Sequence, residues 1–202
     1  MKKLFTIFLV SILLLGATVV SASAATTHTV KRGDSLWKIA VSYQVGLSEI
    51  KAANPTIKNY DLIYPGQQIN IPTVSSATVA YEAEVVRLVN VERAKQGLAP
   101  LKQDWQLSRV ARYKSQDMRD LGYFSHTSPT YGSPFDMMRS FDISYRTAGE
   151  NIAKGYSSPE AVVKGWMNSP GHRANILNSS YTHIGVGYVA SGNYWTQMFI
   201  SK

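Results

Sequence analysis

Residues 28–72 constrain the fold of this chain most, because two short alternating segments there enclose two short helical patterns. In the first pattern, apolar residues recur at helical spacing: Leu36, Ile39, Ala40 and Tyr43. Ser48 can cap a second helix, which ends at Asn54-Pro55 because proline excludes the helical conformation of the residue before it. The alternating segments predict strands at 28–30 and 68–72. The order strand, helix, helix, strand therefore predicts one small βααβ module.

This segment resembles the LysM domain, and the motif positions that carry the resemblance are Val30, Gly33-Asp34-Ser35-Leu36, Ile39-Ala40, Tyr43, Asn54-Pro55 and 65–72. We take residues 27–73 as that domain. The resemblance implies a shallow groove for glycans that contain N-acetylglucosamine, such as peptidoglycan or chitin. Its glycan-binding residues would be Gly33, Asp34, Ser35 and Leu36, facing Asp61, Leu62 and Ile63.

Gly33 has a physical role in such a groove, because backbone groups approach a sugar closely only where no side chain intervenes. The alternative interpretation is that Gly33-Asp34-Ser35 is only a turn followed by a helix cap.

The first 24 residues predict that the protein is exported from the cell. Lys2-Lys3 precede an apolar run at 4–20, and Ala22-Ser23-Ala24 is an A-x-A cleavage site, so residues 1–24 are typical of a secretory signal peptide. An uncleaved membrane anchor is the alternative, since the run is near the lower limit of about 17 residues for spanning a bilayer. No other stretch is apolar enough to span a membrane, so we expect a secreted, extracellular protein that is associated with the cell wall.

Composition narrows the class of protein further. The chain has no cysteine, which favours a bacterial secreted protein whose core suffices without disulfides. Loss of Lys2 and Lys3 with the leader would lower the net charge from +8 to +6. This charge suits an anionic wall polymer or simple solubility, and with no basic run longer than Lys31-Arg32 we expect no nucleic-acid partner.

A second domain is expected at residues 79–202, after a short polar linker at 74–78. Two helical faces come first: Tyr81, Val85, Leu88 and Val89, then Leu107, Val110, Ala111 and Met118. Ser158-Pro159 predicts the start of another helix, since proline fits the first helical position. Alternating residues from Ile184 to Ile200 around Ser191-Gly192-Asn193 predict a hairpin. Helices followed by strands indicate an α+β domain.

Polar islands in this domain resemble the bacterial branch of the CAP superfamily, which groups cysteine-rich secretory, antigen 5 and pathogenesis-related proteins. The islands lie at 124–129, 149–153 and 166–177, with Asn90-Val91-Glu92-Arg93 and Ile184-Gly185-Val186-Gly187 supporting them. The resemblance implies an α-β-α sandwich with a central cavity of two histidines and two acidic residues, which binds a divalent metal in some members.

Residue by residue, the cavity positions match His126, Glu150 and His172, whereas Ser169 stands where the family commonly has its second acid. Two imidazoles and one carboxylate could hold zinc with a water in the open position, more weakly than the full set. Spacing alone does not indicate a metal site, because there is no HExxH or other close ligand pair. Each histidine could instead bond a backbone carbonyl, and His183 is expected to be a strand residue.

Enzyme motifs are scarce: there is no G-x-S-x-G elbow, cysteine nucleophile or Walker loop. The sequence therefore favours a non-enzymatic wall protein of a Gram-positive type bacterium that needs no cofactor and takes part in envelope or spore-coat assembly with wall or coat proteins. The alternative is a metal-dependent wall hydrolase or protease with Glu150 as general base. We expect Glu150 to lie in a Gly-Glu-Asn turn, where its carboxylate bonds backbone N–H groups and holds the loop.

Overall fold

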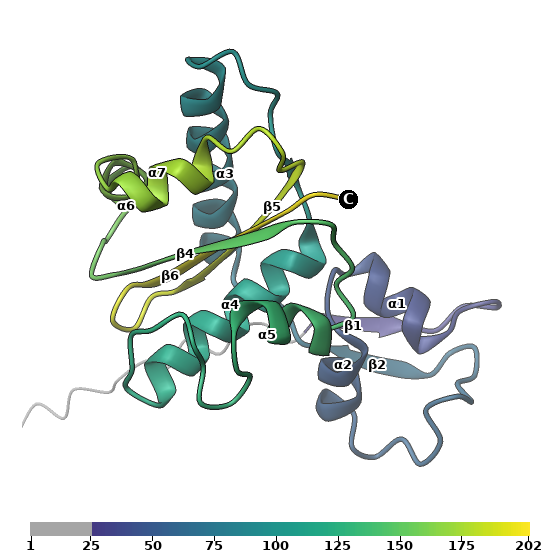
Figure 1. Cartoon of the computed structure of the whole chain (residues 1–202). Coiled ribbons are helices and arrows are strands. Elements are labelled where there is room, and N and C mark those ends of the chain that lie inside the picture. Colours follow the sequence, from purple (N-terminus) through teal and green to yellow (C-terminus); the bar gives the residue numbers. More distant parts are fainter. Residues whose placement is uncertain (1–25) are drawn as a thin grey trace, which may run out of the picture.

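The N-terminal module closes by pairing its two ends. In the computed structural model, which describes residues 26–202, strand β1 (Thr26–Thr29) runs antiparallel to β2 (Gln68–Ile71). Helices α1 (Leu36–Ser42) and α2 (Leu47–Ala53) lie between them in the chain (Figure 1). The predicted βααβ order is confirmed, and the module has its own core. The expected leader, residues 1–24, lies outside the described residues.

The first residues of the two short helices agree only in part with the caps predicted from the sequence. Ser35 caps α1 by accepting a hydrogen bond from the backbone N–H of Lys38. The prediction that Ser48 caps α2 is wrong, because the N-cap lies two residues earlier, at Gly46. A Cβ at Gly46 would lie 1.8 Å from Glu49 Oε2 and 2.3 Å from the Arg109 guanidinium. Glu49 and Arg109 therefore leave no room for a side chain at the N-cap of α2, which accounts for the glycine there.

The second domain is built on one mixed sheet with the order β3-β5-β6-β4. Its strands are β3 (Lys102–Gln103), β4 (Ala148–Lys154), β5 (His183–Val189) and β6 (Tyr194–Ile200). Only β3 and β5 pair in parallel. The predicted β5–β6 hairpin is confirmed, and Gly192 and Asn193 both have positive φ, as a tight hairpin turn requires. Strand β4 is an edge strand, so its outer side is open to loops and helices.

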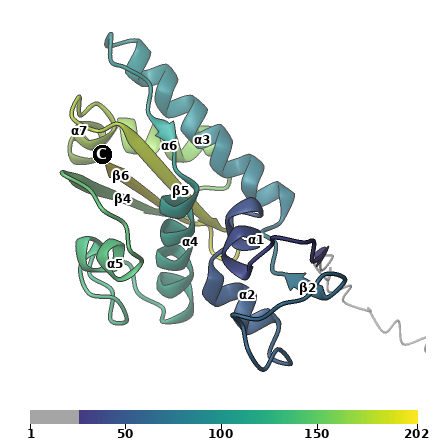
Figure 2. The same ribbon diagram turned by 90° about the vertical axis from the view of Figure 1, so that its right-hand side faces the viewer.

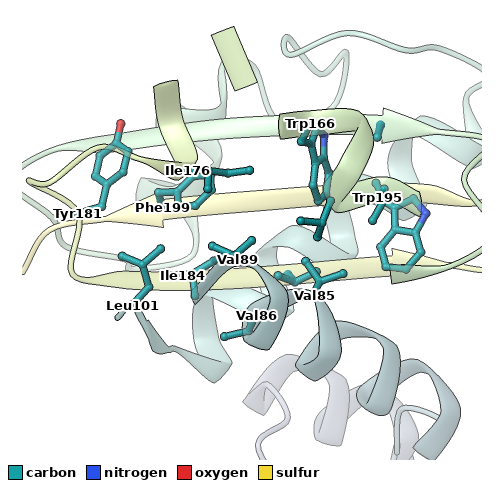
Figure 3. Packing of buried hydrophobic residues seen from close by; sticks show 14 residues of the cluster. Val85, Val86, Val89, Leu101, Trp166, Ile176, Tyr181, Ile184, Trp195 and Phe199 are labelled. Atoms are coloured by element: carbon teal, nitrogen blue, oxygen red, sulfur yellow. The ribbon is translucent and has the colours of Figure 1, made fainter. Parts of the chain in front are cut away.

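Helices cover both faces of this sheet. On one face lie α3 (Ser76–Ala94), α6 (Pro159–Met167) and α7 (Pro170–Ile176); on the other lie α4 (Trp105–Asp120) and α5 (Pro134–Ser140) (Figures 1 and 2). The predicted α-β-α sandwich is therefore confirmed. Figure 3 shows the larger apolar cluster, in which Val85 and Val89 of α3 and Trp166 of α6 pack with Trp195 and Phe199 of the sheet.

Helix α4 packs unusually closely on β5. A Cβ at Gly185 would lie 2.3 Å from the backbone of Leu107, and a Cβ at Gly187 would lie 2.1 Å from the backbone of Arg112. The two glycines of the Ile184–Gly187 motif therefore allow the helix backbone to approach the strand. Helix α3 begins at Ser76, inside the segment expected as the linker, because Ser75 accepts a hydrogen bond from Thr78 N and caps it.

The two modules contact each other through α2 and α4. Glu49 accepts hydrogen bonds from Arg109 Nε at 2.5 Å and from the Tyr113 hydroxyl at 2.8 Å. The Arg109 guanidinium also lies 5.0 Å from the centre of the Phe141 ring. This ring belongs to the second domain, so the contact positions Arg109, whereas the hydrogen-bonded ion pair with Glu49 joins the two modules. Over residues 26–202, no helix combines the length and apolar character needed to cross a membrane.

Candidate functional site

The N-terminal module carries a hollow between the loop that precedes α1 and the loop that leads towards β2. It has a volume of about 190 Å³ and is lined by Asp34, Ser35, Leu36, Trp37, Leu47, Lys51, Tyr60, Asp61 and Ile63. Five of the seven expected groove residues therefore line one hollow. Gly33 and Leu62 are not among the lining residues. The sequence reasoning missed Trp37, which the structure leaves 63% exposed. The available signal was a tryptophan that falls off the apolar stripe of Leu36 and Ile39.

Asp34 serves the local structure of this hollow. Its carboxylate accepts a hydrogen bond from Lys31 N at 2.8 Å and bonds His28 Nε2 at 2.9 Å. The bond to His28, followed by that to Lys31, holds the pKa of the Asp34 carboxyl below its usual value. Lys38 Nζ donates to Gly33 O at 2.8 Å. The expected turn and helix cap are thus present, and they shape one wall of the hollow.

In the second domain, His126 and Glu150 form a direct pair. His126 Nδ1 lies 2.7 Å from Glu150 Oε1, with the histidine side chain 53% exposed and the glutamate side chain 1% exposed. His126 comes from the loop after α4, and Glu150 lies within β4. The expected Gly-Glu-Asn turn is wrong, because Gly149, Glu150 and Asn151 pair in register with Phe199, Met198 and Gln197 of β6. Strand geometry turns Glu150 towards His126 and Asn151 to the opposite face.

The carboxyl group of Glu150 is unusual in its environment. Burial raises its pKa above the ordinary value, and the hydrogen bond from His126 and the nearby Lys114 ammonium only partly offset this. Its second oxygen, Oε2, is buried and accepts no hydrogen bond from the part of the chain that the structure describes. A buried carboxyl beside an exposed imidazole can hold or pass a proton.

The imidazole of His172 makes no hydrogen bond to His126 or Glu150. His172 belongs to α7, and its backbone carbonyl accepts a hydrogen bond from Asn151 Nδ2 at 3.1 Å. Burial lowers the pKa of its imidazole, and repulsion from His126 adds to the effect. Within residues 26–202, no three His, Cys, Asp or Glu side chains are grouped closely enough to hold a metal ion. As arranged, His126, Glu150 and His172 do not fit a metal centre, and zinc binding stays a prediction.

His183 and Ser169 are two further positions that the sequence singled out. His183 begins β5 and bonds Thr182 Oγ1 at 2.8 Å, as expected for a strand residue. Ser169, which stands in the place of the family's second acid, is the N-cap residue of α7 and makes no capping hydrogen bond with its side chain.

A buried polar network supports the loop that carries His126. Lys114 is fully buried, and its Nζ donates to His126 O at 2.9 Å and to the Tyr123 hydroxyl at 3.1 Å. Asp117 accepts hydrogen bonds from Tyr123, from Ser128 Oγ at 2.6 Å and from Thr130 Oγ1 at 2.5 Å. Sequence reasoning missed both residues. The available signal was a lysine on the apolar stripe of α4, next in helical spacing to Val110 and Met118.

Comparison with known families divides the chain in the same way as the fold. The model of the cysteine-rich secretory protein family, CAP, matches residues 86–200, and the model of the LysM domain matches residues 28–72. The first match spans the whole sheet of the second domain, including His126, Glu150 and His172.

Relatives match both parts. The uncharacterized protein YkwD of Bacillus subtilis (strain 168) is 65% identical over 137 residues, which are 67% of this chain and 53% of that protein. The uncharacterized membrane protein YlbC of the same organism is 38% identical over 187 residues, 88% of this chain and 54% of that protein. The chain thus spans about half the length of these two relatives. A short match of 48 residues, 46% identical, covers 24% of this chain and 8% of the spore coat assembly protein ExsA of Bacillus cereus.

Among solved structures, an extracellular protein containing a SCP domain from Bacillus anthracis str. Ames is similar in fold and sequence. It matches with a TM-score of 0.60 and 36% identity, over 68% of this chain and 47% of that chain.

Proposed function

Because the chain belongs to the cysteine-rich secretory protein family and carries a LysM domain ahead of its CAP domain, we propose that it is a secreted protein that binds the cell wall. In this proposal the LysM domain holds N-acetylglucosamine-containing glycan, and the CAP domain acts as a binding or assembly module. The match to a spore coat assembly protein supports coat proteins, alongside wall components, as the partner class.

The observation that carries the glycan-binding role is the hollow at the LysM loops. Asp34, Ser35 and Leu36 from one loop and Asp61 and Ile63 from the other line the same space. The exposed indole of Trp37 adds an apolar face at its rim, and such a face suits the C–H side of a sugar ring. A mostly preformed hollow with a few polar groups is the usual form of a small-ligand site.

Retention on insoluble wall material tests this role. Residues 25–202 are incubated with purified peptidoglycan and with chitin, and the bound fraction is measured after washing. We expect retention by one or both polymers, and Trp37→Ala is expected to reduce it. Leu121→Ala is the matched control, because Leu121 is an exposed apolar residue of the CAP domain. If the folded protein is retained by neither polymer, the glycan-binding role is wrong.

A specific observation also favours a second candidate, a metal-dependent wall hydrolase or protease. The buried carboxyl of Glu150 has a raised pKa, a free oxygen and an exposed imidazole partner. These are properties of a residue that takes up a proton during hydrolysis. Against this candidate, no three metal ligands are grouped among residues 26–202. Ser169 offers no second carboxylate, and the chain has no cysteine that could serve as a nucleophile.

Activity on wall material separates the two candidates. We expect the wild type to release no soluble muropeptides, with or without chelator. Release that Glu150→Gln abolishes at an unchanged melting temperature would move the protein into the hydrolase class.

A further inference from the structure

The LysM domain contains a second hollow on the other side of the loop at residues 59–64. Its volume is about 520 Å³, and its lining residues are Asn54, Thr56, Ile57, Lys58, Asn59, Leu62, Tyr64, Gln67, Gln68 and Asn70. None of these residues lines the first hollow.

The loop at residues 59–64 separates the two hollows, and some of its side chains line one hollow while the others line the second. Tyr60, Asp61 and Ile63 line the first hollow, whereas Asn59, Leu62 and Tyr64 line the second. Leu62, which the sequence placed in the expected groove, therefore lies at the second hollow. A ligand in either hollow would contact the same loop from opposite sides.

The polar lining of the second hollow consists mainly of side-chain amides. Asn59 Oδ1 accepts from Asp61 N at 3.0 Å, and Gln67 Oε1 accepts from Tyr64 N at 3.1 Å. Because the backbone holds each oxygen, the amide nitrogen of each side chain has a fixed direction and keeps its two donors. Neither nitrogen donates a hydrogen bond to any residue in 26–202. Asn70 Nδ2 donates to Ala53 O at 3.4 Å, which leaves Asn70 Oδ1 as an available acceptor.

The charge and the apolar groups of the lining narrow the ligand class. Lys58 is the only charged lining residue, and no carboxylate is present, so the lining does not suit a metal ion or an organic cation. Tyr64 is 60% exposed and Leu62 is 51% exposed. Oriented amide donors, an amide acceptor and an exposed aromatic ring together match a neutral ligand that has both amide groups and an apolar face.

We propose that this hollow is a second saccharide site, which binds the N-acetylated sugars of an uncharged glycan segment. The donors of Asn59 and Gln67 meet the acetamido carbonyl or the hydroxyls, Asn70 Oδ1 accepts from an acetamido N–H or a hydroxyl, and Tyr64 covers an apolar sugar face. The ligand class rests on the proposed glycan-binding function, while the location is independent of the first hollow. With two sites, one LysM domain would bind two segments of a glycan.

Nuclear magnetic resonance on the ¹⁵N-labelled chain, residues 25–202, tests the site with the tetrasaccharide of N-acetylglucosamine as the probe. The backbone signals of Asn59, Gln67 and Asn70 report on the second hollow, and those of Ser35 and Trp37 report on the first. We expect both sets to shift during the titration. Tyr64→Ala is expected to weaken binding at the second set by roughly three- to tenfold, because an aromatic contact with the sugar is lost.

The matched variant Trp37→Ala is expected to weaken the first set and leave the second unchanged. Shifts in the first set alone would overturn the second site and leave the proposed function standing. Shifts in the second set alone would support this site and contradict the role of the first hollow. Shifts in neither set would contradict both the second site and the glycan-binding role of the first hollow. A wall peptide without sugar that shifts the second set as strongly as the tetrasaccharide would show that the site binds peptide.

Discussion

The ion pair between Glu49 and Arg109 is expected to couple the stabilities of the two domains. An exposed pair contributes about 0–1 kcal/mol, whereas breaking a buried pair costs about 3–5 kcal/mol. The Glu49 and Arg109 side chains are 21% and 19% exposed, between these limits. Arg109 donates from both Nε and Nη2, at 2.5 and 2.9 Å. We therefore expect a coupling free energy of about 1–3 kcal/mol.

A double-mutant cycle measures this coupling directly. The free energy of unfolding is obtained in urea for the wild type, Glu49→Ala, Arg109→Ala and the double variant. The control cycle uses Glu84 and Arg87, which pair within α3 and are 34% and 59% exposed. There the coupling should be about 0.3–0.5 kcal/mol. If the interdomain cycle gives no more than the control, the inference that this pair fixes the domains together is refuted.

Acid provides an independent check on the same pair. Burial alone would raise the pKa of the Glu49 carboxyl, but hydrogen bonds from Arg109 and Tyr113 outweigh burial and hold the pKa below 4.5. A lowered folded pKa means that the stabilisation is complete above the unfolded value and is lost as the pH falls through the folded value. The coupling measured at pH 7 should therefore decrease below about pH 4.5 and vanish in stronger acid.

Three further outcomes are expected. Gly187→Ala should lower the free energy of unfolding of the CAP domain in urea by more than about 2 kcal/mol, since the new Cβ would lie 2.1 Å from the Arg112 backbone. A free energy within about 0.5 kcal/mol of the wild-type value would contradict the close packing of α4 on β5. Lys114→Met should leave the His126 carbonyl without its donor, at a cost of about 1–3 kcal/mol in stability, and should speed amide hydrogen exchange in the loop that carries His126. The control Lys154→Met, at an exposed lysine, should do neither; equal exchange in both variants would show that Lys114 does not support the loop. Calorimetry should find no tight zinc uptake, and tight uptake that is lost on changing His126→Ala with His172→Ala would contradict the conclusion that these residues do not fit a metal centre.

Local signals in the sequence predicted the element order of the LysM module, the β5–β6 hairpin and the starts of three helices, but not β3, β4, α5 or α7. Ser35, Asp104 and Ser158 cap their helices through side-chain oxygens, as their place before each apolar pattern indicates. Such signals act over three or four residues, and the chain alone contains all that is needed to recognise them. The N-cap of α2 is the exception: Gly46 stands there without a capping side chain, and Arg109, 60 residues further along from Glu49, occupies the space beside it.

The motifs identified five of the residues that line the first hollow. That His126 rather than His172 pairs with Glu150, and the environment of that pair, came only from the tertiary structure. Glu150 is in an edge strand with one free oxygen, and its charge state depends on burial and on Lys114, a residue of another element. The second hollow depends on which side of the 59–64 loop each side chain takes. Sequence spacing fixes the direction of side chains within a helix or strand. In a loop there is no such period, so the backbone path alone decides it.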